Sequence, residues 1–307
     1  MASILVSGVT GLVGRYVALR LLQQSEDELH VLTRRPPAPP LAEHPRVRVH
    51  QADITDAEKL LAAFKDARPA VVIHPAAIAD VDQCERDHAL ARAVNVDGAA
   101  NLAHACVEVG AHLVHVSTDY VFNGLPESPG PYDEDAQADP VNYYGQTKLE
   151  AEQRVSAICA GRVGLAICRT ALVYGVNPAG RTNFLAMMVN ELRAGRRIRA
   201  VTDQQNTPTH AANLAEMLVA AAEQRATGLY HTAGGELLTR YALAQAVAAQ
   251  FELDAALITP LLSADLGQLA KRPLLSGLRT EKAERELGVP AWSMQRGLEQ
   301  LRQEIAG

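Results

Sequence analysis

Near the amino terminus runs Gly8-Val9-Thr10-Gly11-Leu12-Val13-Gly14, between the apolar segment Ile4–Ser7 and the amphipathic segment Leu12–Gln23. Glycines between a strand and a helix let backbone amides approach a pyrophosphate, and the amino end of the helix favours its negative charge. This context predicts a dinucleotide site on a strand, turn and helix. The alternative is a tight turn that binds no ligand.

The first half of the chain alternates between short apolar runs and amphipathic stretches. The expected strands are Ile4–Ser7, Leu29–Thr33, Val47–His50, Val71–His74, Leu113–Val116 and Val163–Cys168. The expected helices include Leu12–Gln23, Asp56–Lys65 and Ala89–Gly110. This alternation predicts an α/β fold of the Rossmann type, a doubly wound parallel sheet with helices on both faces.

Helices dominate the chain after about Arg169, at residues 183–194, 211–224, 241–251 and 294–305. A smaller C-terminal substrate-binding lobe is therefore expected. The predicted domains are residues 1–170, which bind NADP(H), and residues 171–307, which form mainly the substrate-binding lobe and partly interleave with the Rossmann sheet.

Composition excludes several classes of function. The 307 residues are 48% hydrophobic and 21% charged with a net charge of -6, so we expect no nucleic acid partner. No apolar run approaches the ~18 residues that span a bilayer. The amino terminus lacks an export signal, which predicts a cytoplasmic protein without a membrane partner. The four cysteines are expected as buried free thiols, and the scattered histidines predict no metal site.

Tyr144 and Lys148 carry the expected acid–base chemistry. Residues four apart share one face of a helix, so the phenol and the ammonium can point into the same pocket. A phenol gives up its proton poorly at neutral pH, and a nearby cation lowers its pKa by stabilising phenolate. The pair alone could also belong to an ordinary surface helix.

The end of the second strand predicts which dinucleotide fits. An acidic residue there binds the free ribose 2′-hydroxyl of NADH, whereas arginine accommodates the 2′-phosphate of NADPH. Here the strand is followed by Arg34 and Arg35, with no acidic residue. NADPH is therefore favoured, and NADH stays open as an alternative.

Residues after the third and fourth strands complete the expected cofactor site. Asp53 and Ile54 are placed to contact the adenine, although Asp53 could instead cap a helix that begins near Ala57. The small residues of Pro75-Ala76-Ala77 leave space for the ribose and nicotinamide.

Taken in order, these motifs resemble those of extended short-chain dehydrogenase/reductases, and more narrowly the dTDP-4-dehydrorhamnose reductase group. The glycine spacing is the Gly-x-x-Gly-x-x-Gly variant typical of short-chain dehydrogenases. The matching residues span nearly the whole chain: Gly8 to Gly14, Asp53-Ile54, Ala76-Ala77, Asn95, Ser117 to Phe122, Tyr144 to Lys148, Arg169-Thr170, Asp203-Gln204 through Pro208-Thr209, His231 to Gly234, and Arg272-Pro273 with Ser276 and Leu278.

The resemblance implies roles for three residues. Thr118 would hydrogen-bond the substrate carbonyl, Tyr144 would protonate it as hydride arrives from the nicotinamide, and Lys148 would hold the ribose hydroxyls and lower the Tyr144 pKa. Predicted cofactor-binding residues are Gly8, Thr10, Gly11, Leu12, Val13, Gly14, Arg34, Arg35, Asp53, Ile54, Pro75, Ala76, Ala77, Asn95, Tyr144 and Lys148. Asn95 is expected mainly as a structural bridge. Predicted substrate-binding residues are Thr118, Asp119, Tyr120, Asn183, Gln204 and Arg272; Arg272 could also be a surface cation.

The predicted function is NADPH-dependent reduction of a keto group on a nucleotide-linked 4-keto-6-deoxy sugar, in deoxysugar biosynthesis. The chain departs from the reductase pattern at Leu172, at Leu275 and at His74-Pro75, which leaves the exact sugar open. The alternatives are an NADP-binding regulatory protein that resembles the beta subunit of methionine adenosyltransferase, and a sugar-nucleotide epimerase. Asp119-Tyr120 stands where dehydratases carry Asp-Glu, which argues against dehydration. Oligomeric state stays open, with a homodimer as one candidate.

Overall fold

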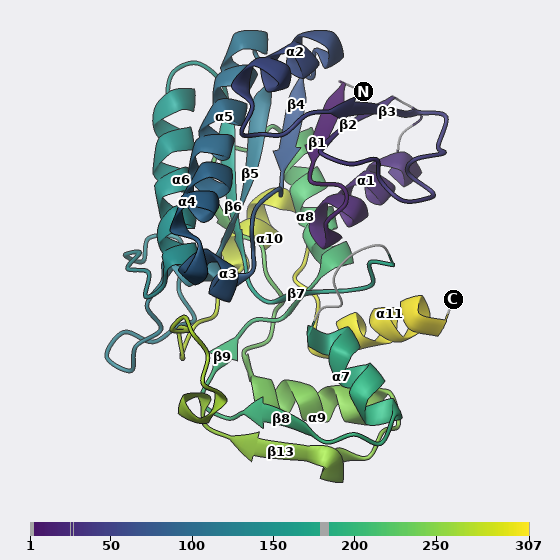
Figure 1. The fold of residues 1–307 in the computed structure, drawn as a ribbon, viewed down its shortest axis with the longest axis vertical. Coiled ribbons are helices and arrows are strands. Elements are labelled where there is room, and N and C mark those ends of the chain that lie inside the picture. Colours follow the sequence, from purple (N-terminus) through teal and green to yellow (C-terminus); the bar gives the residue numbers. More distant parts are fainter. Residues whose placement is uncertain (1–2, 25, 27, 179–183, 307) are drawn as a thin grey trace.

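The computed structural model describes residues 3–24, 26, 28–178 and 184–306. Its centre is a parallel sheet with helices on both faces, and a smaller group of helices and short strands lies beyond one end of that sheet (Figure 1). The sheet has seven strands in the order β11-β6-β5-β4-β1-β2-β3, and neighbouring strands pair in parallel. The predicted Rossmann-type α/β fold is confirmed.

The strands of this sheet are β1 Ile4–Ser7, β2 Leu29–Thr33, β3 Val47–Gln51, β4 Val71–His74, β5 His112–Thr118, β6 Leu165–Thr170 and β11 Gly228–His231. The helices around it are α1 Leu12–Gln24, α2 Ala57–Ala67, α3 Val81–Arg86, α4 His88–Arg92, the π-helix η1 Ala93–Asp97, α5 Gly98–Val109, the short 3₁₀ helix η2 Asp119–Val121, α6 Tyr143–Cys159, α8 Ala211–Glu223 and α10 Glu281–Leu287. The remaining elements are β7 Val173–Tyr174, α7 Phe184–Arg193, β8 Ile198–Val201, β9 Gln205–Asn206, β10 Thr209–His210, β12 Leu238–Thr239, α9 Arg240–Gln250, η3 Ala255–Leu257, β13 Ile258–Leu261, η4 Ser263–Leu266 and α11 Met294–Ala306.

The six predicted strands form close to where they were expected. The apolar side chains of the five inner strands are largely buried on both faces of the sheet, whereas β3 is an edge strand that exposes Val49. One face packs against α1, α8 and α10, and the other against α2, α5 and α6. The seventh strand, β11, was not predicted. It lies beyond the predicted boundary at residue 170 and pairs with β6, so the second half of the chain returns to the sheet.

The smaller group of elements has its own hydrophobic core. Side chains of α7, α9 and α11 pack there with β8 and β13, and the largest buried ones include Leu185, Met188 and Tyr174. After this group the chain runs back along residues 270–279 and reaches the carboxyl end of the sheet, where Ser276 contacts Asp119. None of the described helices is long and apolar enough to cross a bilayer.

Candidate active site

A cavity of about 560 Å³ lies at the carboxyl ends of β1, β2, β3 and β4. The strand order reverses between β1 and β4, which is where open α/β sheets bind their ligands. The predicted cofactor residues that line the cavity are Gly8, Thr10, Gly11, Arg34, Arg35, Asp53, Ile54, Pro75, Ala76 and Ala77. Leu12, Val13 and Gly14 belong to the first turn of α1 behind them.

The turn after β1 needs glycine for steric reasons. Gly8 has a φ of 62°, in the left-handed region that favours glycine, and a Cβ on it would lie 2.9 Å from the Ala76 Cα. A Cβ on Gly14 would lie 2.4 Å from the Gly8 carbonyl oxygen. The first turn of α1 therefore packs directly on the end of β1, and its amino end faces the cavity.

The cavity rim fits an anionic group. The Arg34 side chain is 71% exposed, and its guanidinium lies 3.8 Å from the Asp53 carboxylate. Asp53 accepts hydrogen bonds from the backbone N and the Oγ1 of Thr55, at 2.9 and 2.8 Å. The residue that caps α2 is Asp56, which accepts from the Lys59 backbone N. The alternative prediction that Asp53 caps this helix is wrong, because Asp53 lies in the turn before the cap.

Thr118 and Tyr144 meet at the carboxyl end of β5. Asn142 caps α6 by accepting from the Gly145 backbone N at 2.8 Å, so Tyr144 lies in the first turn of the helix. A Cβ on Gly145 would lie 2.1 Å from the Tyr120 carbonyl oxygen. Only glycine allows α6 to pack this closely on η2, and the packing brings the Tyr144 phenol into hydrogen-bonding contact with Thr118.

Lys148 is buried beside the same strand, and its ammonium donates to the Val116 carbonyl at 2.8 Å. Burial lowers the pKa of Lys148 to about 8. The predicted lowering of the Tyr144 pKa by Lys148 is wrong. Burial raises the pKa of the phenol above its ordinary value; the Thr118 hydrogen bond opposes that rise and the Asp119 carboxylate adds to it. The phenol is therefore protonated at neutral pH, as a proton donor requires.

Asn95 connects α6 to the loop after β4. Its Oδ1 accepts from the Ile78 backbone N at 2.8 Å, and its Nδ2 donates to the Ile78 carbonyl and to Thr147 Oγ1, each at 3.1 Å. Thr147 in turn donates to the Tyr144 carbonyl at 2.7 Å. Ile78 lines the cavity and Asn95 does not, so Asn95 makes the contacts of a structural bridge.

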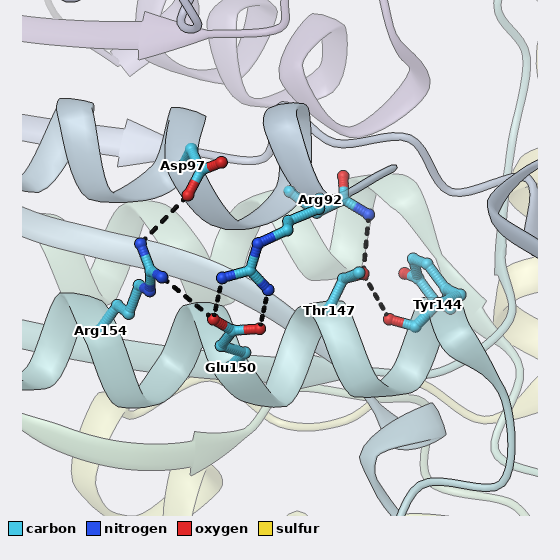
Figure 2. Close-up of polar contacts among 7 residues, drawn as sticks. Arg92, Asp97, Tyr144, Thr147, Glu150 and Arg154 are labelled. Carbon is cyan, nitrogen blue, oxygen red and sulfur yellow. Dashed lines mark hydrogen bonds and ion pairs between the residues drawn. The ribbon is translucent and has the colours of Figure 1, made fainter. Parts of the chain in front are cut away.

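Figure 2 shows an ion-pair network on the outer side of α6. The Glu150 carboxylate accepts two hydrogen bonds from Arg92, at 2.6 and 2.8 Å, and lies 3.2 Å from Arg154. Arg154 also reaches Asp97 at 3.1 Å. These contacts join α6 to α4 and to the π-helix η1, which carries Asn95.

The expected substrate side contains a cation that sequence analysis missed. Arg272 forms an ion pair with Asp82 at 3.0 Å. Arg240 is half-buried beside Tyr120 and Asp119, and its guanidinium lies over the Phe184 ring at 5.0 Å. Burial lowers the pKa of Arg240, whereas Tyr120 and Asp119 raise it. One sequence feature points to Arg240, because a cation in the first turn of a helix opposes the helix dipole.

Two further predicted substrate residues, Gln204 and Asp119, are both buried. Gln204 is buried, and its Nε2 has no hydrogen-bond partner among the described residues. The Asp119 side chain accepts from Thr118 Oγ1 at 3.2 Å and from Ser276 Oγ at 2.8 Å. Burial raises the pKa of Asp119 to about 6, although both hydroxyls and Arg240 lower it. Asn183, another predicted substrate residue, lies outside the described residues.

The sequence also led to predictions about the cysteines and the possible metal ligands. Cys84, Cys106, Cys159 and Cys168 are all buried free thiols, as predicted. Within residues 3–178 and 184–306, apart from positions 25 and 27, no three His, Cys, Asp or Glu side chains are grouped to hold a metal ion.

Three comparisons with known proteins agree with this geometry. The profile of the family described as "RmlD substrate binding domain" matches residues 1–306. A dTDP-4-dehydrorhamnose reductase of Mycobacterium tuberculosis is 34% identical over 286 residues, which cover 91% of this chain and 85% of the relative. The methionine adenosyltransferase 2 subunit beta of Pongo abelii is 31% identical over 288 residues, covering 92% of this chain and 81% of the relative.

The fold also matches a solved structure. The crystal structure of a dTDP-4-dehydrorhamnose reductase from Bacillus anthracis in complex with NADP superposes with a TM-score of 0.83. The match covers 99% of each chain at 27% identity.

Proposed function

Because this chain belongs to the RmlD substrate binding domain family, we propose that it uses NADPH to reduce the keto group of a nucleotide-linked 4-keto-6-deoxy sugar. The chain is an NAD(P)-dependent oxidoreductase of the extended short-chain dehydrogenase/reductase type. One observation supports the proposal most strongly: Tyr144 lies beside the buried Thr118 at the carboxyl end of β5, where Thr118 acts on its phenol. The neighbouring strand β4 carries one side of the cofactor cavity at the same end of the sheet.

Two hydroxyls can act on one carbonyl oxygen. Thr118 donates a hydrogen bond to that oxygen, and Tyr144 donates the proton that converts the developing alkoxide into an alcohol. The bound cofactor supplies the hydride. Burial keeps the phenol protonated until the oxygen becomes basic enough to take the proton. In this proposal Lys148, whose ammonium donates to the Val116 carbonyl, binds the nicotinamide ribose.

The choice of NADPH is supported by the rim of the cavity. Arg34 and Arg35 both line it, and the exposed Arg34 guanidinium can move from Asp53 to a phosphate. Arginine binds phosphate oxygens through several N–H donors at once.

A nucleotide-linked substrate is supported by Arg240. Its half-buried guanidinium lies beside Tyr120, and Asp119 is the carboxylate that acts on it. That carboxylate is also engaged by two hydroxyls, so a diphosphate would complete the charge balance. Arg272 already has Asp82 as its ion partner, which makes Arg240 the stronger candidate.

The test is a cofactor-oxidation screen of the purified protein. NADPH absorbance is followed with dTDP-, GDP- and UDP-linked 4-keto-6-deoxy sugars and with simple ketones. Turnover that needs both the keto group and the nucleotide supports the proposal. Turnover of simple ketones at the same kcat/KM would contradict a sugar nucleotide as the substrate.

A regulatory role is the second candidate, because the similarity to the methionine adenosyltransferase beta subunit has nearly the same identity and coverage. Such a protein would bind NADPH without consuming it. No NADPH oxidation across the screen, together with a change in the kinetics of a methionine adenosyltransferase catalytic subunit, would favour this role.

A further inference from the structure

The Thr118 hydroxyl has one proton and two acceptors that compete for it. A hydroxyl donates one hydrogen bond and accepts two. In the structure Thr118 Oγ1 accepts from the Tyr120 backbone N at 3.2 Å and faces Asp119 Oδ1 at 3.2 Å. A substrate carbonyl bound next to Thr118 would be the second acceptor. The state of Asp119 therefore decides where the Thr118 proton points.

Ser276 fixes which oxygen of Asp119 faces Thr118. Ser276 follows 157 residues after Asp119 in the chain and donates to its Oδ2 at 2.8 Å. The serine is held by its backbone N, which donates to the Gln205 carbonyl at 3.0 Å. Because the Ser276 hydrogen bond to Oδ2 is shorter than the Thr118 hydrogen bond to Oδ1, a proton taken up by the carboxylate is directed to Oδ1.

Asp119 is enclosed by groups from four parts of the chain. Its side chain is 1% exposed, and the polar or charged groups that face it are Thr118 and Tyr120 beside it, Tyr144 from α6, Arg240 from α9 and Ser276 from the returning segment. Arg240 is the cation among them. Burial outweighs it and raises the pKa of Asp119 to about 6, so the carboxyl changes charge close to neutral pH.

We propose that Asp119 and Ser276 are a positioning pair that sets the direction of the Thr118 hydroxyl. The inference rests on the proposed function, since it places a ketone oxygen next to Thr118. When Asp119 is ionised, Thr118 donates to it and offers only lone pairs to the substrate. When Asp119 has taken a proton from solvent onto Oδ1, it donates to Thr118, and Thr118 donates to the ketone.

The pair predicts a specific pH profile for reduction. In the wild type, kcat falls as pH rises through about 6, because Asp119 loses its proton. Asp119→Asn has no ionisable carboxyl and removes this dependence. Ser276→Ala removes a donor that stabilises the carboxylate, which raises the Asp119 pKa and moves the fall in kcat upward by about one pH unit. NADPH affinity stays within about twofold in each variant, since neither side chain lines the cofactor cavity.

The matched control is Ser263→Ala. Ser263 also donates to an aspartate, Asp203, at 2.7 Å, in the smaller group of elements. Its pH profile should equal that of the wild type. A Ser276→Ala enzyme whose kcat drops equally at every pH, with the midpoint unmoved, would show a merely structural role and overturn the proposal. The proposal is also overturned if kcat of Asp119→Asn falls with the same pH midpoint as kcat of the wild type.

A second measurement separates this inference from the proposed function. Carboxyl ¹³C NMR of the NADPH-bound protein follows the Asp119 titration directly, with the resonance identified by its loss in Asp119→Asn. Ser276→Ala should raise the midpoint by about one pH unit. If the wild type reduces no keto sugar, the proposed function has failed, and this shift alone decides whether Ser276 controls Asp119. An unchanged midpoint overturns the pair.

Discussion

The cofactor cavity and the region around Thr118, here called the catalytic corner, are built from different kinds of contact. Most of the cavity is built from turns that directly follow β1, β2, β3 and β4, so most of its residues are placed by the strand before them. Val94 of η1 and Asn177 after β7 complete the lining. The corner around Thr118 combines β5, α6, α9 and the returning segment with Ser276. Local sequence sets the first region, whereas long-range packing sets the second, and substitutions in the two should therefore fail differently.

The largest expected effect is a loss of turnover from a substitution in the catalytic corner. Tyr144→Phe removes the proton donor but keeps the ring, so kcat should fall by about 10²- to 10⁴-fold while the NADPH dissociation constant stays within about twofold. Stopped-flow NADPH oxidation and fluorescence titration measure the two quantities. Tyr143→Phe is the control, since its ring stacks on His88 outside the corner. Equal loss of NADPH affinity and turnover would show that the corner and the cavity are not separable.

The next largest effect is a loss of stability from a substitution beside the cofactor cavity. Gly14→Ala places a Cβ about 2.4 Å from the Gly8 carbonyl oxygen, so α1 must shift from β1. We expect a loss of about 1–3 kcal/mol in the free energy of unfolding and weaker NADPH binding. Gly235→Ala is the control, because its Cβ would meet its nearest neighbour, Ala291, at 3.5 Å. Urea unfolding with and without NADPH tests this, and equal stability of the two variants would contradict the packing argument.

A smaller and more selective effect concerns Arg34 and Arg35. Changing both to alanine should weaken NADPH by about tenfold, equivalent to ~1.4 kcal/mol, and leave NADH within about twofold. The exposed Arg199→Ala on β8 is the control. Isothermal titration with both cofactors gives the ratio. If both cofactors weaken equally, the rim does not recognise the 2′-phosphate.

The difference between local and long-range contacts also explains which site residues could be predicted from the sequence. Strand ends and the glycine turn follow from local pattern, so many of the predicted cofactor residues lie together in the cavity. Arg15, Val94 and Asn177 also line it and were not predicted. Arg240 and Ser276 reach the corner only because α9 and the returning segment pack there, which no local pattern specifies. The hydrogen bond of Lys148 was missed for the same reason, because the Val116 carbonyl that accepts it belongs to another element.

The smallest effect is expected from the ion pairs that join α6 to its neighbours. Arg92, Glu150 and Arg154 are between 34% and 42% exposed, so solvent screens them. Glu150→Gln should therefore lower the free energy of unfolding by under about 1 kcal/mol. The loss should shrink at high salt.

The matched control for this network is Glu191→Gln, which breaks an ion pair with Arg196 between α7 and the residues that follow it. Because Asn95 and the Asn142 cap still hold α6, Glu150→Gln should leave kcat within about twofold of the wild type. Urea unfolding at two salt concentrations and steady-state kinetics measure both quantities. A tenfold fall in kcat would mean that the position of Tyr144 depends on these surface charges, and the catalytic corner would then extend to the outer side of α6.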